Sequence, residues 1–380
     1  MVVAQLEPAA VVMRRISAVG TVMALAIAAH TVGNLGKLRK PNVQVPPVDE
    51  RVSVLIPARN EQAGIAAAVQ SALAQTGVPA LEVIVLDDNS TDETSSIVRS
   101  IDDERLRLIS STQDPPVNWL GKPWACAQLA DQASGSVLVF MDADVRLSPD
   151  AVRASVRAMR AHAFAMVSPY PRQLADNWLA VLTQPLVTWS WCALLPLRWS
   201  ERSARPSLAA ANGQFLVMDA DTYRRVGGHG SVAAEVIEDV ALMRAFKNAG
   251  ATTCTMDGSA IASCEMYESP EQTIDGYAKS LWAAFGGPMA SIGINALLFV
   301  AFVAPPIAAI SARSKSARAV GAMGYMAGAA SRALVARRMG TRIWPDSALH
   351  PASVAAFITI NAISWRRHKQ GLNHWKGRAV

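Results

Sequence analysis

Two pairs of carboxylates in this sequence stand at spacings that can do chemistry. Asp142 and Asp144 follow the apolar stretch Ser136–Met141 and are separated by one residue, and Glu238 and Asp239 are adjacent. In an extended stretch, residues i and i+2 point the same way, so Asp142 and Asp144 can face one cation. Mg²⁺ takes oxygen ligands, usually one or two carboxylates plus substrate phosphates. The first pair therefore predicts a metal site, with an ordinary Asp-rich surface turn as the alternative.

The second pair has the features of a general base. Glu238-Asp239 follows a glycine-rich stretch and begins a predicted helix, Val240–Lys247. The helix dipole stabilises a carboxylate in the first turn as the anion, ready to accept a proton. A carboxylate that removes the proton of an attacking hydroxyl accelerates a reaction roughly 10²–10⁴-fold. The alternative is that Asp239 is simply a first-turn residue.

Several other sites are excluded by the same residues. Leu147 stands where an EF-hand loop needs glycine, and Arg153 where it needs a bidentate glutamate. No G-x-G-x-x-G follows the first predicted strand, and G-x-x-x-x-G-K-[ST] is absent. Dinucleotide-dependent dehydrogenases and Walker-type ATPases are therefore disfavoured.

The elements that must position these residues alternate between apolar strands and helices from Arg51 to about Asp275. Such alternation implies a parallel sheet covered by helices, with ligands bound beyond the carboxyl ends of the strands. The predicted strands are Val52–Ile56, Leu81–Leu86, Leu106–Ile109 and Ser136–Met141, and the predicted helices are Glu61–Gln75, Thr91–Ser100 and Lys122–Ala133.

Polar side chains gather just after the ends of these strands. This coincidence predicts that they share one edge of the sheet and one ligand site. The residues concerned are Asn60, Glu61, Asp87, Asp88, Asp142 and Asp144.

Five pieces of the chain, in order and spacing, resemble the family 2 glycosyltransferases, which have the GT-A fold. They cover nearly the whole predicted soluble body, and together they are specific. The pieces are Val54-Leu55-Ile56-Pro57-Ala58-Arg59-Asn60-Glu61, Val85-Leu86-Asp87-Asp88-Asn89-Ser90-Thr91-Asp92, Gly121-Lys122-Pro123-Trp124-Ala125, Asp142-Ala143-Asp144 and Glu238-Asp239.

The resemblance implies a role for each matching residue. Pro57, Asn60 and Glu61 would line the nucleotide pocket, and Asp88 would hold the base or ribose of a UDP-sugar. Lys122 would lie near the donor diphosphate. Asp144, with Asp142, would bind Mg²⁺ or Mn²⁺ on the diphosphate, and Asp239 would be the general base. These implied site residues are Pro57, Asn60, Glu61, Asp88, Lys122, Asp142, Asp144 and Asp239.

Further motifs resemble the membrane-bound branch of that family that glycosylates hydrophobic acceptors, including carotenoid-type and hopanoid-associated enzymes. One departure matters. Processive polysaccharide synthases carry Q-x-x-R-W after the base, whereas the comparable place here keeps Trp282 but has neither the Gln nor the Arg. This favours transfer of a single sugar. The motifs are Asn212-Gly213-Gln214-Phe215, Gly227-Gly228-His229, Glu238-Asp239-Val240-Ala241-Leu242 and Trp375-Lys376-Gly377-Arg378.

The composition favours membrane contact. Only 17% of the 380 residues are charged and 51% are hydrophobic, against about 25% charged in a typical soluble domain. Four scattered cysteines exclude a disulfide framework and make structural zinc unlikely under the usual spacing rules. The net charge of +6 is concentrated near apolar segments, so anionic lipid headgroups explain it more simply than nucleic acid does.

Apolar stretches at both ends are expected to meet the membrane. The uncharged part of the first, Ile16 to Leu35, has the roughly 20 residues that a bilayer core requires. Basic residues follow it, as on a cytoplasmic flank, although a cleaved signal peptide is an alternative. We expect a transmembrane anchor at 11–35, a glycosyltransferase domain at 50–282, a C-terminal membrane region at 283–365 with an open helix count, and a basic tail at 366–380.

The tryptophan-rich segment 178–199 is apolar but carries Pro185 and Pro196, which argue against a straight spanning helix. Because tryptophan prefers the headgroup level, we expect this segment to lie on the bilayer surface. A buried core helix is the alternative.

Together these observations predict an α/β protein with a GT-A, Rossmann-like, mostly parallel sheet and transmembrane helices at both ends. The predicted function is a membrane-bound, cytosol-facing, inverting transferase that moves one sugar from a UDP-sugar to a lipid or isoprenoid. Glucose is the sugar that we expect. The alternatives are a processive polysaccharide synthase, a non-catalytic nucleotide-sugar-binding membrane protein, and a nucleotidyltransferase, which would normally have a glycine-rich loop after the first strand.

Overall fold

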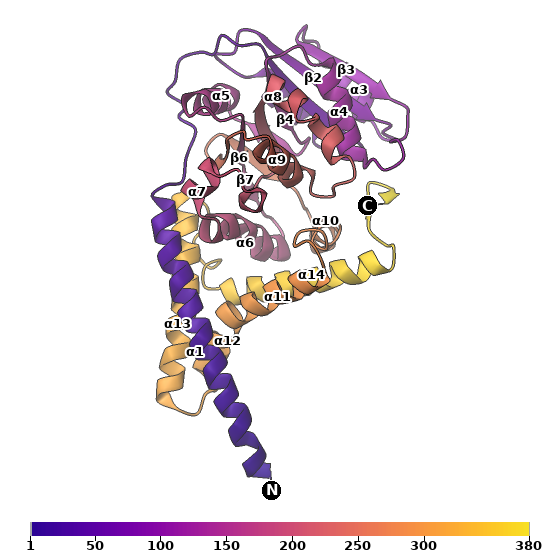
Figure 1. Ribbon diagram of the computed structural model, residues 1–380. Coiled ribbons are helices and arrows are strands. Elements are labelled where there is room, and N and C mark those ends of the chain that lie inside the picture. The colour runs from indigo at the N-terminus through magenta and orange to yellow at the C-terminus, as the bar shows by residue number, and fades with distance from the viewer. Residues whose placement is uncertain (1, 380) are drawn as a thin grey trace.

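A mixed seven-stranded sheet forms the centre of the protein in the computed structural model, which describes residues 2–379 (Figure 1). β2 runs parallel to β1 and β3, β4 runs parallel to β1, and β6 runs parallel to β9. Only β8 is reversed against its neighbours β4 and β6. The mostly parallel sheet expected from the sequence is therefore confirmed. In sheet order the strands are β3 (Leu106–Ser111), β2 (Leu81–Asp88), β1 (Val52–Ala58), β4 (Val137–Met141), β8 (Phe215–Asp219), β6 (Met166–Tyr170) and β9 (Thr253–Asp257).

Helices cover both faces of this sheet, which is why its central strands are apolar at nearly every position. Alternate residues of β1 enter opposite cores. Val54 packs into a cluster with helices α2 and α5, and Leu55 packs into a cluster with α4 and α9. The helices of this body are α2 (Ile65–Leu73), α3 (Thr94–Arg99), α4 (Gly121–Gln132), α5 (Ala151–Ala161), α7 (Leu197–Arg202), α8 (Ala220–Arg225) and α9 (Glu238–Asn248), with 3₁₀ turns η1 (Pro206–Leu208) and η2 (Gly228–Val232).

A second, three-stranded sheet lies beside the end of β4. β10 (Ala262–Glu265) pairs with β5 (Val145–Leu147) on one side and with β7 (Arg172–Leu174) on the other. Because β5 begins directly after Asp144, this small sheet fixes the outgoing end of the predicted metal motif.

Two helical segments are long and apolar enough to cross a membrane, Val12–Leu35 and Pro288–Ser311, and only 28% of each is buried within the protein. The first belongs to α1 (Val2–Leu35), which packs against α13 (Lys315–Arg338) and α12 (Ala304–Ser311) in a rod that projects away from the sheet body (Figure 1). The expected N-terminal membrane helix is thus a helix of suitable length and exposure.

The second segment changes direction along its length. It consists of α11 (Pro288–Leu298), a π-helical turn η3 (Phe299–Val303) and α12. α11 contacts α14 (His350–Lys369), which crosses beneath the sheet body, whereas α12 packs beside α1 and α13 (Figure 1). π-helical turns are a common cause of such bends.

The tryptophan-rich segment forms α6 (Trp178–Leu194), capped at its start by the side chain of Asn177. Trp189 and Trp191 are buried, while Trp178 is exposed. α6 packs against α1, α13 and α14, and also against α10 (Pro270–Ala278), so it joins the helical rod to the sheet body. The buried tryptophans agree with the core-helix alternative, and the placement of the segment on a bilayer surface stays a prediction to which the exposed Trp178 and Trp199 are suited.

Candidate active site

A cleft of about 900 Å³ lies at the carboxyl edge of β1, β2 and β4, as expected for a doubly wound sheet. The sheet side of the cleft supplies Pro57, Glu61, Asp88, Asp142 and Asp144. α4 supplies Lys122, and α9 supplies Glu238 and Asp239. Val187 of α6 and residues of α10, including Tyr277, form the opposite wall. Of the six polar residues that the sequence had placed after strand ends, the structure brings Glu61, Asp88, Asp142 and Asp144 into this cleft, whereas Asn60 and Asp87 are not among the described residues that line it.

Asp142 and Asp144 face this cleft from a turn rather than from an extended stretch. The turn is closed by a hydrogen bond from the Val145 amide to the Asp142 carbonyl, 3.1 Å long. The Asp142 amide donates to the Gln214 carbonyl on the neighbouring strand at 3.1 Å. The expectation that both carboxylates share one cleft holds, but the extended backbone from which it was argued does not.

The Asp144 carboxylate is buried and only partly satisfied. Its Oδ1 is buried and has no hydrogen-bond partner among the described residues. Burial raises the pKa of Asp144 to about 7, and the nearby charge of Asp142 raises it further while a hydrogen bond from Cys264 opposes the rise. A divalent cation between the two carboxylates would relieve both the burial cost and the repulsion.

Within residues 2–379, no group of three or more His, Cys, Asp or Glu side chains is arranged to hold a metal ion. A cation at Asp144 and Asp142 would therefore take its other ligands from water or from a bound diphosphate. This is the usual arrangement for Mg²⁺ at phosphate-handling sites.

Lys122 links the predicted metal motif to the predicted base. Its Nζ lies 2.8 Å from Asp142 Oδ1 and 3.0 Å from Glu238 Oε1. Burial would lower the pKa of Lys122, but the two carboxylates raise it well above its ordinary value. The side chain is thus held as a cation in the middle of the cleft.

Asp239 lies in the first turn of α9, as the sequence predicted. Its Oδ1 accepts a hydrogen bond from the Val240 amide at 2.8 Å. Burial raises the pKa of Asp239 to about 7, Glu238 adds to the rise, and Lys122 and the Gly213 amide oppose it. A carboxylate that titrates near neutrality is suited to exchange protons at physiological pH.

Gly213 is the point of closest packing around this group. A Cβ added there would lie 3.2 Å from Lys122 Nζ, 3.3 Å from Glu238 Oε1 and 3.4 Å from Asp239 Cβ. The glycine in Asn212-Gly213-Gln214 therefore lets the backbone approach the cation and both acids, which a larger residue would displace.

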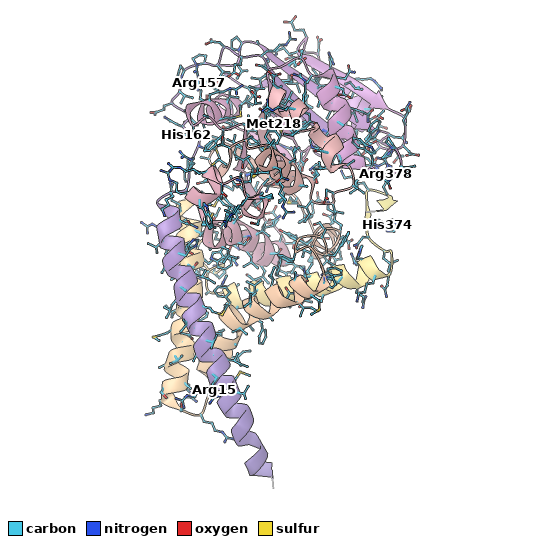
Figure 2. All side chains as sticks on the ribbon, in the orientation of Figure 1. Arg15, Arg157, His162, Met218, His374 and Arg378 are labelled. Atoms are coloured by element: carbon cyan, nitrogen blue, oxygen red, sulfur yellow. The ribbon has the colours of Figure 1, made fainter. Side chains whose placement is uncertain are left out.

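The C-terminal tail covers the part of the cleft that contains Glu61 and Asp88. After α14 the chain returns as a short hairpin, β11 (His374–Trp375) and β12 (Arg378–Ala379). Arg378 forms an ion pair with Asp88, and Lys376 forms one with Glu61. Figure 2 labels His374 and Arg378 where this tail lies beside the sheet body.

Arg59 ties the tail to the strand ends. Its Nη1 donates to the Asp88 carbonyl at 2.6 Å, and its Nε donates to the Lys376 carbonyl at 3.1 Å. Asp88 Oδ1 stays buried and without a hydrogen-bond partner among the described residues. Burial raises the pKa of Asp88, and the Arg378 guanidinium opposes that rise. One oxygen of Asp88 is thus available to a ligand while the other is held by Arg378.

Asn60 is placed differently from the other predicted residues. It adopts a left-handed backbone conformation with φ of 53°, and its Oδ1 accepts from the Thr91 amide at 2.8 Å. The side chain thereby holds the loop after β2 against the loop after β1, and it is not among the described residues that line the cleft. Its contact with a nucleotide stays a proposal, and its direct contact is with the protein.

Sequence reasoning missed three basic residues of the cleft. Arg378 and Lys376 were noticed only as part of a resemblance, and Lys279 was not among the predicted site residues. Lys279 lines the cleft, and burial together with Lys122 lowers its pKa to about 8. The available signal was the Trp375-Lys376-Gly377-Arg378 motif, but nothing local indicates that it folds back by almost 300 residues to Asp88.

Comparisons with known proteins support the family that the sequence motifs resemble. Residues 53–201 match the family described as Glycosyl transferase family 2. The 4,4'-diaponeurosporenoate glycosyltransferase of Staphylococcus aureus (strain USA300) is 27% identical over 339 residues, which cover 86% of this chain and 87% of that enzyme. The enzyme of the same name from Staphylococcus haemolyticus (strain JCSC1435) is 29% identical over 245 residues, 61% of each chain.

A solved structure shares the fold across almost the whole chain. The mannosyltransferase PcManGT from Pyrobaculum calidifontis, in complex with GDP-Man and Mn²⁺, superposes with a TM-score of 0.57 at 19% identity. The match covers 92% of this chain and 99% of the other.

Proposed function

We propose, on the premise that this chain is a family 2 glycosyltransferase of the GT-A fold, that it transfers one sugar from a nucleotide-sugar to a carotenoid-type acceptor at a membrane. The proposed donor is UDP-glucose, and the accepting group is a hydroxyl or carboxyl on a lipid or isoprenoid. The domain proposed to do this spans 50–282, anchored by 11–35 and 283–365, with the catalytic side in the cytosol.

One observation carries the acceptor class: the cleft is shared between the sheet edge and the helices that join it to the rod. Val187 of α6 and Tyr277 of α10 line the same cleft as the carboxylates. Both helices pack on α14, which runs beside the candidate membrane segment α11. A wall of this kind lets an apolar acceptor reach the carboxylates along α6 and α10.

Asp239 is the proposed general base. For a hydroxyl acceptor, the bond from the acceptor oxygen to the anomeric carbon forms as the bond from that carbon to the diphosphate breaks. The proton of the hydroxyl passes to Asp239, and the nucleoside diphosphate leaves. A single base and a single displacement imply inversion at the anomeric carbon. A carboxylic acid acceptor needs this proton acceptor only when its own carboxyl group is protonated.

Asp144 and Asp142 are the proposed ligands of Mg²⁺ or Mn²⁺, and the unpartnered Asp144 Oδ1 supports this assignment. When bound, such an ion stabilises the negative charge that develops on the leaving diphosphate. Lys122 holds a positive charge beside Asp142 and so favours a diphosphate at the same place. Asp88 offers Oδ1 to the ribose or base of the donor.

A processive polysaccharide synthase is the second candidate within the same fold. It is disfavoured because Gln and Arg are missing at Tyr277–Trp282, although Lys279 from that region supplies a cation to the cleft. A non-catalytic binding protein is disfavoured because the metal pair and the base are all present and line one cleft.

The test is a transfer assay with the full-length protein in detergent, a carotenoid carboxylic acid or alcohol, Mn²⁺, and either UDP-glucose or GDP-mannose. We expect a monoglycosylated carotenoid, identified by mass, from UDP-glucose. With the alcohol as acceptor, the Asp239→Asn variant should form product roughly 10²–10⁴-fold more slowly, whereas Asp221→Asn, which changes an exposed carboxylate on α8, should match the wild type. Product from GDP-mannose alone would mean that the donor is GDP-mannose and not UDP-glucose. A polymeric product would favour the polysaccharide synthase. No product with either donor would overturn the proposal.

A further inference from the structure

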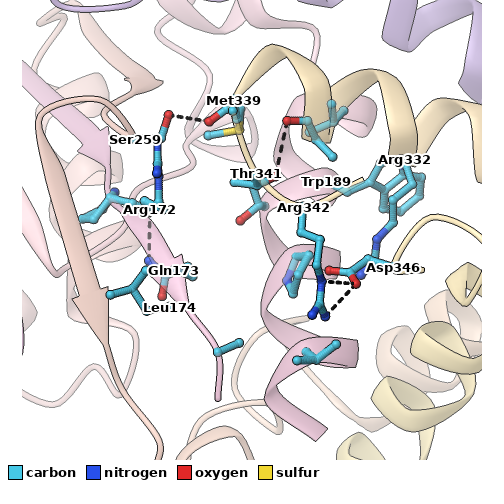
Figure 3. Close-up of a pocket in the computed structure, with 18 of the residues that line it drawn as sticks. Arg172, Gln173, Leu174, Trp189, Ser259, Arg332, Met339, Thr341, Arg342 and Asp346 are labelled. Carbon is cyan, nitrogen blue, oxygen red and sulfur yellow. Dashed lines mark hydrogen bonds and ion pairs between the residues drawn. The ribbon is translucent and has the colours of Figure 1, made fainter. Parts of the chain in front are cut away.

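A second cavity, of about 320 Å³, is lined in part by β7 (Figure 3). Its walls come from β7, the middle of α6, the C-terminal end of α13 and the loop that follows α13. Gln173 lines both cavities and donates to Gln214 Oε1 at 2.8 Å on the cleft side. The two cavities are therefore neighbours that share one residue.

Arginine dominates the charge of this second cavity. Its charged lining residues are Arg172, Arg332, Arg342, Asp176 and Asp346. Asp346 is already engaged, because Arg342 Nε and Nη2 both lie 2.8 Å from its Oδ1 (Figure 3). Asp176 is on the exposed rim. Within residues 2–379 no carboxylate lies within 4.0 Å of the guanidinium of Arg332 or Arg172.

Arg332 is the central group. Its side chain is only 2% exposed, yet its Nε and Nη1 have no hydrogen-bond partner among the described residues. Its remaining contact is a hydrogen bond from Nη2 to the Leu182 carbonyl at 3.3 Å. A guanidinium stays charged in proteins, and an unpaired buried charge is strongly unfavourable. The expected partner of such a group is an anion that occupies the cavity.

The surroundings of Arg332 specify what kind of anion this is. The lining of the cavity also includes the apolar side chains of Pro185, Trp189, Val335 and Met339. A free inorganic anion would gain nothing from that wall, whereas an amphiphile would bury part of its chain there.

The depth of the site agrees with a membrane amphiphile. Ser331, the neighbour of Arg332, bonds to Thr31 of α1, with 2.9 Å between their hydroxyl oxygens. The candidate span of α1 ends at Leu35, four residues later, which is about 6 Å along a helix. The headgroup layer of a bilayer is of similar thickness on each side, roughly 5–8 Å. Arg332 thus lies near the level at which oxyanions of membrane lipids are found.

We propose that this Arg332 cavity binds the oxyanion head of an anionic membrane amphiphile, with the guanidinium Nε and Nη1 as its donors. Guanidinium groups bind phosphate and carboxylate oxygens in a planar, two-point geometry. The same chemistry suits a lipid phosphate and the carboxylate of an isoprenoid acid. Binding here does not depend on glycosyl transfer, so the site can exist whether or not the proposed function holds.

The experiment is native mass spectrometry of the full-length protein after incubation with phosphatidylglycerol, phosphatidylcholine or retinoic acid as an isoprenoid carboxylate. We expect one tightly held phosphatidylglycerol on the wild type and at least about tenfold weaker binding to Arg332→Met, since two charge-assisted hydrogen bonds are lost. Arg337→Met, an exposed arginine on the same helix outside the cavity, is the matched control. Arg332→Lys should bind with intermediate affinity.

Each outcome decides the proposal. Arg332-dependent retention of retinoic acid but not phosphatidylglycerol would assign the site to an isoprenoid carboxylate. Equal retention of phosphatidylglycerol by the wild type and Arg332→Met would overturn the proposal. Should Arg332→Met fail to fold, thermal unfolding of the wild type is decisive: phosphatidylglycerol or retinoic acid should raise Tm and phosphatidylcholine should not, and no difference among them would overturn it.

Discussion

Replacing Lys122 by methionine tests the electrostatics of the cleft. Lys122 Nζ lies 2.8 Å and 3.0 Å from carboxylate oxygens of Asp142 and Glu238, and its charge also lowers the pKa of Asp239. The methionine side chain keeps a similar shape and removes the charge. The other influences on the pKa of Asp239 stay in place: burial and Glu238 raise it, and the backbone amides of Val240 and Gly213 lower it. The pKa of Asp239 must therefore rise above about 7 in this variant.

A simple charge–charge estimate gives the size of the pKa shift of Asp239. Two unit charges about 4 Å apart interact by ~4 kcal/mol at an effective dielectric constant of ~20. Lys122 faces two closer carboxylates, so only part of this acts on Asp239. We take that part as about 1.4 kcal/mol, which is roughly one pKa unit.

The assay is kcat/KM for sugar transfer between pH 5 and 9, which reports groups of the free enzyme. Asp239 accepts a proton only when it is ionised, so the wild-type rate should rise as pH passes through about 7 and then level off. In Lys122→Met the rising limb should move about one pH unit higher, whatever happens to the plateau. Lys122→Arg keeps the charge and should keep the limb in place. A limb at the same pH in the methionine variant would refute this reasoning.

Three further predictions concern other parts of the cleft. Arg378→Ala should weaken nucleoside diphosphate binding about tenfold in calorimetry, because Asp88 loses its ion-pair partner. Lys369→Ala, which changes an exposed residue at the end of α14, should leave the affinity unchanged. An unchanged affinity in Arg378→Ala would show that the tail is not part of the donor site. Gly213→Ala should lower kcat about tenfold with Tm nearly unchanged, while Gly293→Ala, which meets nothing within 4 Å, should be silent. The raised pKa of Asp144 contributes stability at low pH that is lost as pH rises through about 7. The metal-free protein should therefore have a lower Tm at pH 8 than at pH 6, and Mn²⁺ should restore it at pH 8; a Tm at pH 8 that Mn²⁺ leaves unchanged would contradict the metal assignment.

The sequence was most informative where local pattern decides structure. Strands β1, β2, β3 and β4 begin within one residue of their predicted starts, because buried parallel strands are continuous apolar runs. The site followed from them, since the carboxyl ends of parallel strands meet at one edge. Asp239 was placed in the first turn of its helix for a similarly local reason.

Long-range packing is what the sequence did not disclose. The reversal of β8 and the burial of α6 depend on contacts with elements distant in the chain. The return of Arg378 to Asp88 is of the same kind, since an ion pair across 290 positions leaves no periodic signal. The contact of Asn60 with the loop after β2 was also not foreseen, because it depends on a left-handed backbone that lets the Asn60 Oδ1 accept from the Thr91 amide.

The most direct measurement compares donor binding with transfer in Asp239→Asn, the single substitution that changes only the proposed proton acceptor. Calorimetry with UDP and Mn²⁺ gives the affinity, and mass spectrometry of the glycosylated carotenoid gives the rate. With a hydroxyl-bearing carotenoid as the acceptor, we expect affinity within about threefold of the wild type and a rate lower by roughly 10²–10⁴-fold. Transfer by Asp239→Asn at close to the wild-type rate would show that Asp239 is not the base.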